Sequence, residues 1–145
     1  MASAAGFGSS KSSEPCRCLS GMSYESCCEP LHREKQRAAT AEQLMRSRYS
    51  AFALAEVDYL IATHPDSLTP LLQCRKELRK NCRQVRWLGL KIKAVEAGAV
   101  DDLEGTVTFE AIFGAGGQRN VMNETSLFQR RDGDLKGHWL YIKPL

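Results

Sequence analysis

The sequence predicts an α+β fold in which about three helices pack against one face of a four-stranded antiparallel sheet, behind a short cysteine-rich segment. Apolar residues recur at three- and four-residue spacing between residues 40 and 84, which is typical of amphipathic helices. Between residues 88 and 143 they alternate with polar residues, as in half-buried strands. Four of the six cysteines fall between residues 16 and 28. With 145 residues the chain has the length of one domain with a small appendage.

The first helix is expected to begin after Thr40. Thr40-Ala41-Glu42-Gln43 is a capping box, in which the threonine hydroxyl accepts from the backbone amide of Gln43 and the glutamine side chain reaches back. Apolar residues then follow on one helical face as far as Ala53.

Two further helices are expected before the sheet. Val57–Ile61 carries a helical apolar face that must end before Pro65, because proline disfavours helical geometry at the preceding residue. Thr69-Pro70 is an N-cap followed by proline at the first helical position, so a third helix should run from there to about Gln84.

The alternating half predicts a meander of four strands joined by tight turns. Leu88, Leu90 and Ile92 should share the buried face of the first strand. One face of the third strand carries Met122, Glu124, Ser126 and Phe128. The expected strands and turns are, in order, Leu88–Lys93, Thr106–Phe113, the turn Ala115–Gln118, Arg119–Arg130, the turn Asp132–Asp134, and His138–Lys143.

The clustered cysteines predict a metal site. They form two pairs, separated by an eight-residue loop that is long enough to fold one pair back onto the other. Four thiolates suit tetrahedral zinc, and a closed four-ligand shell leaves no position for an activated water. We therefore expect one structural zinc, without which so short a segment should not fold. The expected ligands are Cys16, Cys18, Cys27 and Cys28.

Alternatives to this zinc site remain open. An iron–sulfur cluster also takes four thiolates, although the ferredoxin spacings differ. A disulfide would need a secretory route, and residues 1–11 lack the apolar core of a signal peptide. His32 can replace Cys28 as the fourth ligand, but an ordinary surface histidine is favoured. About 12 Å of helix should separate Cys74 from Cys82, which is too far for a disulfide or for binding one metal ion together. We therefore expect both to be buried or half-buried residues without a role in the metal site.

The cysteine segment resembles the SEC-C zinc motif. Its sequence is Cys16-Arg-Cys18-Leu-Ser20-Gly21-Met-Ser-Tyr24-Glu-Ser-Cys27-Cys28. With the blocks that follow, the chain from Pro15 onward resembles the YchJ family. These blocks are Glu29-Pro30-Leu31-His32, residues 40–52, Asp58-Tyr59-Leu60, Thr63-His64-Pro65, Asn123-Glu124-x-Ser126-x-Phe128 and Trp139-x-Tyr141. The resemblance implies a SEC-C segment followed by a nuclear transport factor 2-like domain, a cone of helices against a curved sheet.

The chain departs from the family pattern at three points. Leu19 stands where the motif usually has glycine, and Met22 stands where lysine is common. If the glycine position needs a positive φ, Leu19 is strained by about 1 kcal/mol. The chain also stops at Leu145, whereas many relatives carry a second SEC-C segment, which argues against a role that needs two zinc segments.

Positive charge concentrates on the third helix, although the net charge of the chain is only +3. Between Arg75 and Lys93 there are eight basic residues and one acidic residue. One stripe of the helix should carry four arginines, Arg75, Arg79, Arg83 and Arg86. This stripe can bind either the phosphates of RNA or the carboxylates of an acidic protein. No aromatic residue interleaves the stripe, so a solvated helix face is the favoured interpretation.

A cone of this kind encloses a pocket in which inward-facing polar residues can bind a ligand or catalyse a reaction. Glu124 lies on the buried face of its strand, where we expect it to pair with Arg46 or Arg48. Such a pair, orienting the sheet against the helix, is favoured over an acid–base role. The pocket candidates are Arg48, Tyr49, Tyr59, Glu124 and His138.

These expectations divide the chain into a disordered leader (1–14), a SEC-C zinc segment (15–32) and a nuclear transport factor 2-like domain (38–145). The leader is rich in serine, and a short organellar transit peptide is the alternative to a cytoplasmic location. No apolar run approaches the ~18 residues of a membrane-spanning helix.

Three functional hypotheses follow. The favoured one is a binding module, in which the zinc segment presents a surface for a protein partner and the cone is its scaffold, without catalytic residues. The second is a small enzyme or small-ligand binder around Glu124, Arg48 and His138. The third is RNA binding through Arg75–Arg86. A filled cavity with Glu124 locked to Arg48 would favour the scaffold, whereas Glu124 reaching an empty space would favour the pocket.

Overall fold

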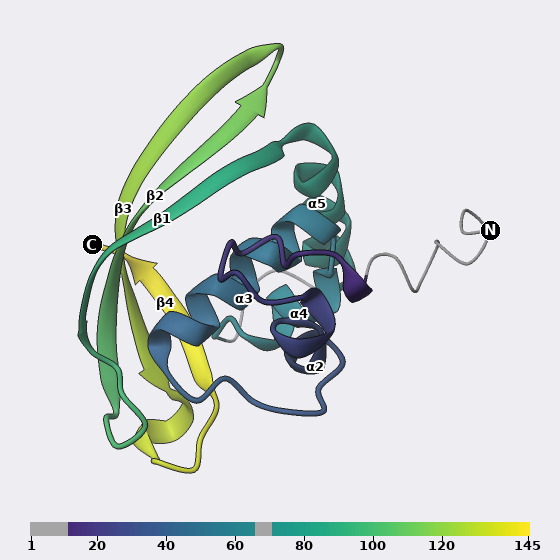
Figure 1. The fold of residues 1–145 in the computed structure, drawn as a ribbon. Coiled ribbons are helices and arrows are strands. Elements are labelled where there is room, and N and C mark those ends of the chain that lie inside the picture. Colours follow the sequence, from purple (N-terminus) through teal and green to yellow (C-terminus); the bar gives the residue numbers. More distant parts are fainter. Residues whose placement is uncertain (1–11, 66–70) are drawn as a thin grey trace.

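The computed structural model describes residues 12–65 and 71–145, and it confirms the α+β architecture. Four antiparallel strands in the order β1-β2-β3-β4 form one curved open sheet, with the helices on its concave side (Figure 1). The strands are β1 (Arg86–Ala97), β2 (Glu104–Ala115), β3 (Gln118–Arg130) and β4 (Trp139–Pro144). This is the meander that the alternating pattern predicts.

Three helices fill the concave side, in the predicted order. They are α3 (Ala41–Leu54), α4 (Val57–Ala62) and α5 (Leu71–Gln84). The cysteine segment contributes the short 3-10 turn η1 (Tyr24–Ser26) and the single-turn α2 (Glu29–His32), which packs against α3 (Figure 1). A further 3-10 turn, η2 (Arg131–Gly133), joins β3 to β4.

The central helix begins at its predicted cap. The hydroxyl of Thr40 accepts from the N–H of Gln43 at 3.1 Å. The return bond differs by one residue from a standard capping box, since the Gln43 side chain accepts from the N–H of Ala39, at 2.6 Å. Thr69-Pro70, the predicted start of α5, lies outside the described residues.

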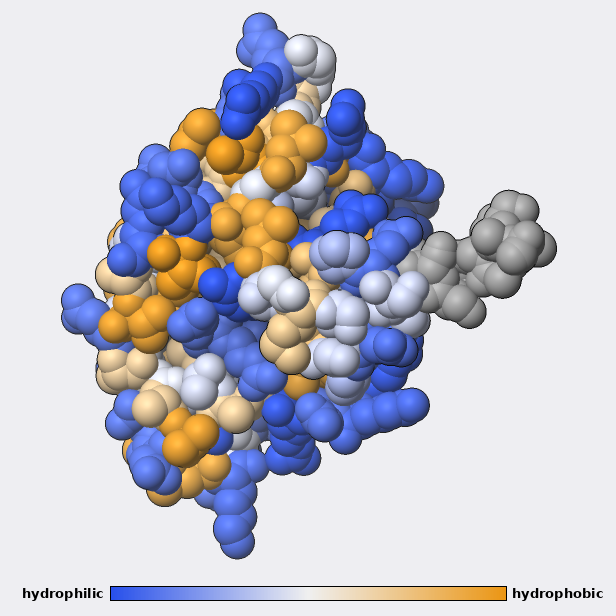
Figure 2. All heavy atoms as spheres, viewed as in Figure 1, coloured by the Kyte–Doolittle hydropathy of each residue, from blue (hydrophilic) through white to orange (hydrophobic). Residues whose placement is uncertain are grey.

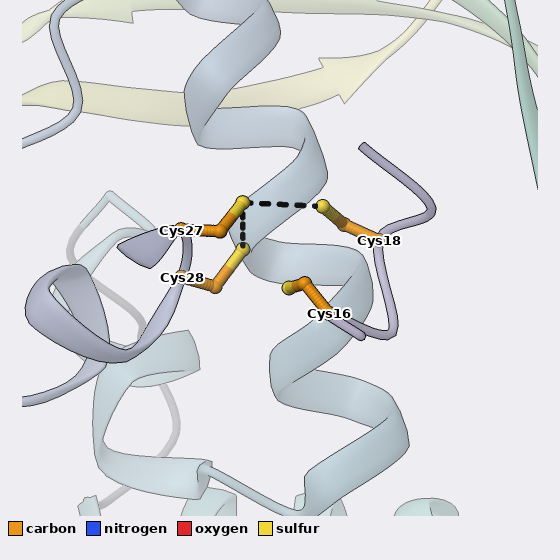
Figure 3. Close-up of side chains that lie close together, drawn as sticks. All are labelled: Cys16, Cys18, Cys27 and Cys28. Carbon is orange, nitrogen blue, oxygen red and sulfur yellow. Dashed lines mark hydrogen bonds between the residues drawn. The ribbon is translucent and has the colours of Figure 1, made fainter. Parts of the chain in front are cut away.

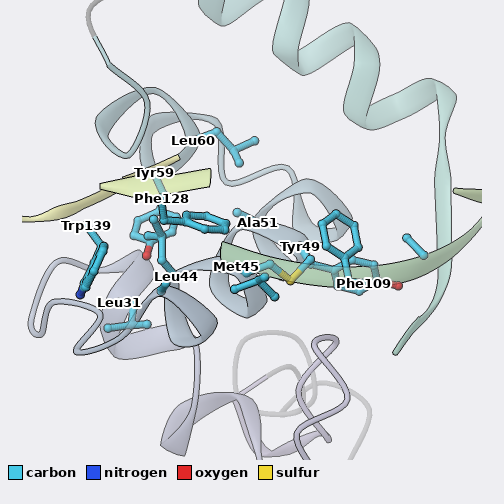
Figure 4. Packing of buried hydrophobic residues seen from close by; sticks show 13 residues of the cluster. Leu31, Leu44, Met45, Tyr49, Ala51, Tyr59, Leu60, Phe109, Phe128 and Trp139 are labelled. Carbon is cyan, nitrogen blue, oxygen red and sulfur yellow. The ribbon is translucent and has the colours of Figure 1, made fainter. Parts of the chain in front are cut away.

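The core lies between α3 and the concave face of the sheet. From α3, Leu44 and Tyr49 pack in one cluster with Phe109 of β2 and Phe128 of β3 (Figure 4). Trp139 of β4 is 1% exposed and belongs to the same cluster. The helical and alternating apolar patterns therefore meet face to face.

One strand face differs from the prediction. The pairing of β1 with β2 skips Leu88, which lies in a β-bulge between Trp87 and Gly89 and is 50% exposed. Because the extra residue shifts the alternation, Trp87 rather than Leu88 packs on the core, together with Leu90 and Ile92. The expectation that Leu88 is buried was wrong.

The turn between β2 and β3 has the predicted position. Ala115 pairs with Gln118, and Gly116 and Gly117 between them have φ values of 59° and 79°. Positive φ at both central residues is what a type I′ hairpin turn requires, and glycine adopts it without steric cost.

The first described residues contact the cysteine segment. The hydroxyl of Ser12 donates to the carboxylate of Glu29 at 2.9 Å, within the stretch expected to be a disordered leader. Residues 1–11 of that stretch lie outside the described residues.

The surface is divided between apolar and hydrophilic areas. In the space-filling view, apolar atoms gather between the strands and the helices, whereas hydrophilic atoms dominate the rim of the molecule (Figure 2). In the described part of the chain, no helix is both long and apolar enough to cross a membrane.

Candidate functional site

Two short backbone features bring the cysteine pairs together. The N–H of Cys16 donates to the carbonyl of Met22 at 2.8 Å, which closes a small hairpin around Cys18. The second pair follows the turn η1, and Cys28 is the N-cap residue of α2. The hairpin and the helix start thus present the two pairs to each other (Figure 3).

The four cysteine sulfurs lie within 4.8 Å of one another. The Sγ of Cys27 is 3.6 Å from that of Cys18 and 3.8 Å from that of Cys28 (Figure 3). In a tetrahedral site with Zn–S bonds of ~2.3 Å, neighbouring sulfurs are about 3.8 Å apart. The cluster therefore has the donor set and the spacing of a tetrahedral metal site.

Crowding separates the acidities of these thiols. Hydrogen bonds from Cys16 and Cys28 hold the pKa of Cys18 far below its usual range. Hydrogen bonding with Cys18 raises the pKa of Cys16 to about 11, and contacts with Cys16 and Cys18 raise that of Cys28 further. A divalent cation at the centre of the cluster would offset the repulsion between thiolates and allow all four to ionise.

A second layer of contacts holds the cysteine loop in place. The hydroxyl of Ser20 lies 3.2 Å from the Sγ of Cys27. Arg46 of α3 donates to the carbonyl of Cys18 at 2.8 Å, while its Nε pairs with Glu42 at 3.1 Å. Such outer contacts orient the ligands of metal sites. The spacing of the cysteines carried no signal for Arg46, which is 28 residues from its partner.

His32 is not positioned as a metal ligand. Its Nε2 donates to the carbonyl of Ser47 at 2.8 Å and lies 3.3 Å from the hydroxyl of Ser50. Its Nδ1 accepts from the hydroxyl of Tyr24 at 2.6 Å, so neither nitrogen is available to replace Cys28. The expectation of a surface histidine was wrong, since the residue is 7% exposed, and burial lowers its pKa.

The strain anticipated at Leu19 is present. Its φ is 62°, in the left-handed region that favours glycine. Leu19→Gly should therefore raise the free energy of unfolding of the metal-loaded protein by about 1 kcal/mol, measured by chemical denaturation. Gly21→Ala is the opposite change, because Gly21 has a φ of 91°, and should lower it. A Leu19→Gly variant less stable than the wild type would contradict the strain argument.

Of the two cysteines outside the cluster, only Cys82 has a described side chain, and it is not part of the metal-site cluster. Cys82 is half-buried on α5, as expected, and burial raises its pKa. The side chain of Cys74 lies outside the described residues.

The basic stripe is shorter than predicted. Arg75 pairs with Asp58 at 2.8 Å, and Arg79 and Arg83 are exposed on α5. Arg86 does not continue the stripe, because α5 ends two residues earlier and Arg86 begins β1.

The five pocket candidates divide between two hollows. A cavity of about 240 Å³ lies between α3 and the concave face of the sheet, and Arg48, Tyr49 and Glu124 line it. Tyr59 and His138 line a separate hollow of about 290 Å³. The structure therefore brings together three of the candidates and places the other two elsewhere.

Glu124 does not form the expected ion pair with Arg46 or Arg48. Its Oε2 accepts from the hydroxyl of Ser126 at 2.5 Å and from that of Tyr141 at 3.4 Å. Ser126 lies on the same strand face, as the alternation predicts, but was not expected to be a partner of Glu124. The strand pattern could have identified Ser126, because residues two apart on a strand project side by side from the same face.

Arg48 is a buried cation held by neutral groups. It donates to the carbonyl of Leu60 at 3.0 Å and to the hydroxyl of Thr63 at 2.6 Å. Its guanidinium lies 5.0 Å from the ring centroid of Tyr141. Burial lowers its pKa to about 10, so it stays protonated at neutral pH. Arg48 thus fastens α3 to α4 and does not neutralise the carboxylate in the cavity.

Comparison with known proteins identifies the family. The family described as "YchJ, middle NTF2-like domain" matches residues 40–144. The chain belongs to the YchJ family. A UPF0225 protein from Chromobacterium violaceum is 41% identical over 131 residues, which cover 90% of this chain and 91% of the relative. A UPF0225 protein from Pectobacterium carotovorum is 44% identical over 134 residues, covering 90% and 82%.

Two solved structures are similar to this YchJ-family chain over most of its length. A SEC-C motif containing protein from Rhodopseudomonas palustris has a TM-score of 0.72 at 30% identity, over 90% of this chain and 96% of its own. A SEC-C motif containing protein from Psychrobacter arcticus has a TM-score of 0.71 at 26% identity, over 90% and 80%. The family and the fold that the motifs indicate are thereby confirmed.

Proposed function

We propose that this YchJ-family protein binds one zinc ion, as a structural centre, through Cys16, Cys18, Cys27 and Cys28. The observation that supports this most directly is the spacing of the four sulfurs, all within 4.8 Å. Four protein ligands close the coordination shell, so the ion holds the segment together and activates no water. Thiolate ligands need reduced cysteines, which favours a cytoplasmic location.

The second part of the proposal is a protein partner that docks on the zinc segment, with the cone as scaffold. Leu19 and Met22 support it, because they are 56% and 49% exposed beside the cluster. Large apolar side chains that gather on a surface mark interaction sites. A Leu19→Ser, Met22→Ser double variant should keep its metal and lose the partner in chemical cross-linking. Retained cross-links would place the partner elsewhere.

Native mass spectrometry of protein purified without chelator tests the metal assignment. We expect one zinc per chain in the wild type and none in Cys16→Ser or Cys28→Ser, because removing one thiolate opens the shell. Cys82→Ser, which removes a half-buried thiol outside the cluster, is the matched control and should stay loaded. A fully loaded Cys28→Ser variant would overturn the four-cysteine assignment.

A second candidate function is small-ligand binding in the 240 Å³ cavity. It is favoured by one observation: Glu124 lines this cavity and forms no ion pair with Arg48, so it can accept from a ligand. The volume is below the 300–1,000 Å³ typical of drug-sized sites, which restricts the ligand to about the size of one aromatic ring.

Phenol is a suitable probe for this cavity, followed by amide chemical shifts. Its ring fits the aromatic walls and its hydroxyl can donate to Glu124. Glu124→Gln should weaken binding by about tenfold, because a charge-assisted hydrogen bond becomes a neutral one. Glu110→Gln, a change on the same sheet outside the cavity lining, should have no effect. Absence of binding at millimolar phenol would leave the cone as a scaffold.

A further inference from the structure

The outer face of the sheet carries two arginines on either side of a glycine. Arg86 of β1 pairs with Gly114 of β2, which pairs in turn with Arg119 of β3. Paired residues project from the same face of a sheet, and a Cβ placed on Gly114 would lie 3.9 Å from that of Arg86. With strands ~4.8 Å apart, the two arginine Cα atoms are separated by about 10 Å, across a position without a side chain.

A third arginine reaches the same place from the helical layer. Arg83, in the last turn of α5, lines a cleft of about 320 Å³ together with Arg86 and Arg119. Gln84 and Gln118 also line it, and Leu88 is an apolar lining residue. The end of α5 and the start of β1, which follow each other in the chain, thus line one cleft with the start of β3, more than 30 residues later.

The charge of this cleft is not balanced locally. No aspartate or glutamate is among its described lining residues. Within the part of the chain that the structure describes, none of the three arginines forms an ion pair, whereas Arg75 on the same helix pairs with Asp58. A cation in the last turn of a helix interacts favourably with the helix dipole, and this interaction explains why Arg83 is stable there without an ion pair. It does not account for Arg86 and Arg119, which lie on strands.

We propose that this cleft is a binding site for a phosphate group, independent of the metal centre. The phosphate lies above Gly114, between Arg86 and Arg119, with Arg83 closing the helical side. Guanidinium groups suit this role because they stay charged and donate two parallel hydrogen bonds to phosphate oxygens. The helical spacing of the arginines does not predict this site, which depends on the sheet register that brings Arg86 and Arg119 to either side of Gly114.

The phosphate can belong to a small ligand or to a nucleic-acid backbone, and two probes distinguish these sources. Full-length metal-loaded protein is titrated with inorganic pyrophosphate by calorimetry and with a fluorescein-labelled oligothymidine of twelve nucleotides by anisotropy. Saturable pyrophosphate binding supports a small phosphorylated ligand. Binding of the oligonucleotide alone, weakening as salt is raised, supports a nucleic-acid backbone. If neither probe binds at millimolar concentration, the proposal is wrong.

Matched variants distinguish binding at this specific cleft from non-specific attraction to the positive charge of the surface. Arg119→Gln should weaken binding of the active probe by about tenfold or more, because a charge-assisted contact is lost. Arg79→Gln removes the same charge from α5 outside the cleft lining and should change binding less than twofold. Gly114→Val keeps every charge, suits a strand, and should also reduce binding by filling the gap between the arginines. Equal effects of Arg79→Gln and Arg119→Gln, or normal binding by Gly114→Val, would overturn the proposal.

Discussion

Removal of the metal is expected to unfold the segment 15–32 and to destabilise the domain behind it. The segment has only a small cluster of its own, made of Cys16, Cys18, Cys28 and Tyr24. A thousandfold excess of the free metal ion over its Kd would contribute about 4 kcal/mol to folding, so its removal should cost a similar amount. Chemical denaturation of metal-loaded and chelator-treated protein measures the difference, and Cys18→Ser should reproduce the effect of the chelator.

Loss of the metal should also destabilise the domain, because the cysteine segment packs against α3. Leu31, 1% exposed, belongs to the main core, and Arg46 donates to the carbonyl of Cys18. Amide resonances of α3 should therefore shift when the metal is removed, while those of the β2–β3 hairpin tip stay in place. Cys82→Ser should retain wild-type stability. A chelator-treated protein with an unchanged unfolding midpoint would show that the segment and the domain are independent.

His32→Ala should lower the free energy of unfolding by about 3 kcal/mol without removing the metal. The imidazole is buried between the rings of Tyr24 and Tyr59, with centroid distances of 5.5 and 4.9 Å. Its loss leaves a cavity, deprives the Tyr24 hydroxyl of its acceptor and removes one of the donors to the Ser47 carbonyl, which keeps the hydroxyl of Ser50. Equilibrium denaturation measures the loss of stability, and native mass spectrometry measures the metal content.

Two control variants make the His32 result specific. Tyr24→Phe removes one hydrogen bond and keeps the ring, so it should cost only about 1 kcal/mol. His64→Ala changes an exposed histidine and should have almost no effect. Loss of the metal in a folded His32→Ala variant would show that the imidazole, rather than one of the four thiolates, completes the coordination shell.

The differences between expectation and structure have physical causes that can be named. Glu124 was expected to meet an arginine, but Ser126 is its neighbour on the same strand face and satisfies it locally. Leu88 was expected inside, but the β-bulge turns it outward. His32 was expected on the surface, because the sequence does not show that α2 docks on α3. In each case the decisive contact depends on packing rather than on the spacing of neighbouring residues.

The sequence by itself determined the elements, their order and the four converging cysteines. A capping threonine, a Gly-Gly turn and the two apolar periods act within a few residues of chain, so their effects do not depend on the rest of the molecule. Only the tertiary structure decided the surroundings of His32 and Glu124 and the approach of Arg86 to Arg119. These depend on strand register and helix docking, which one extra residue in a strand or one buried side chain can change.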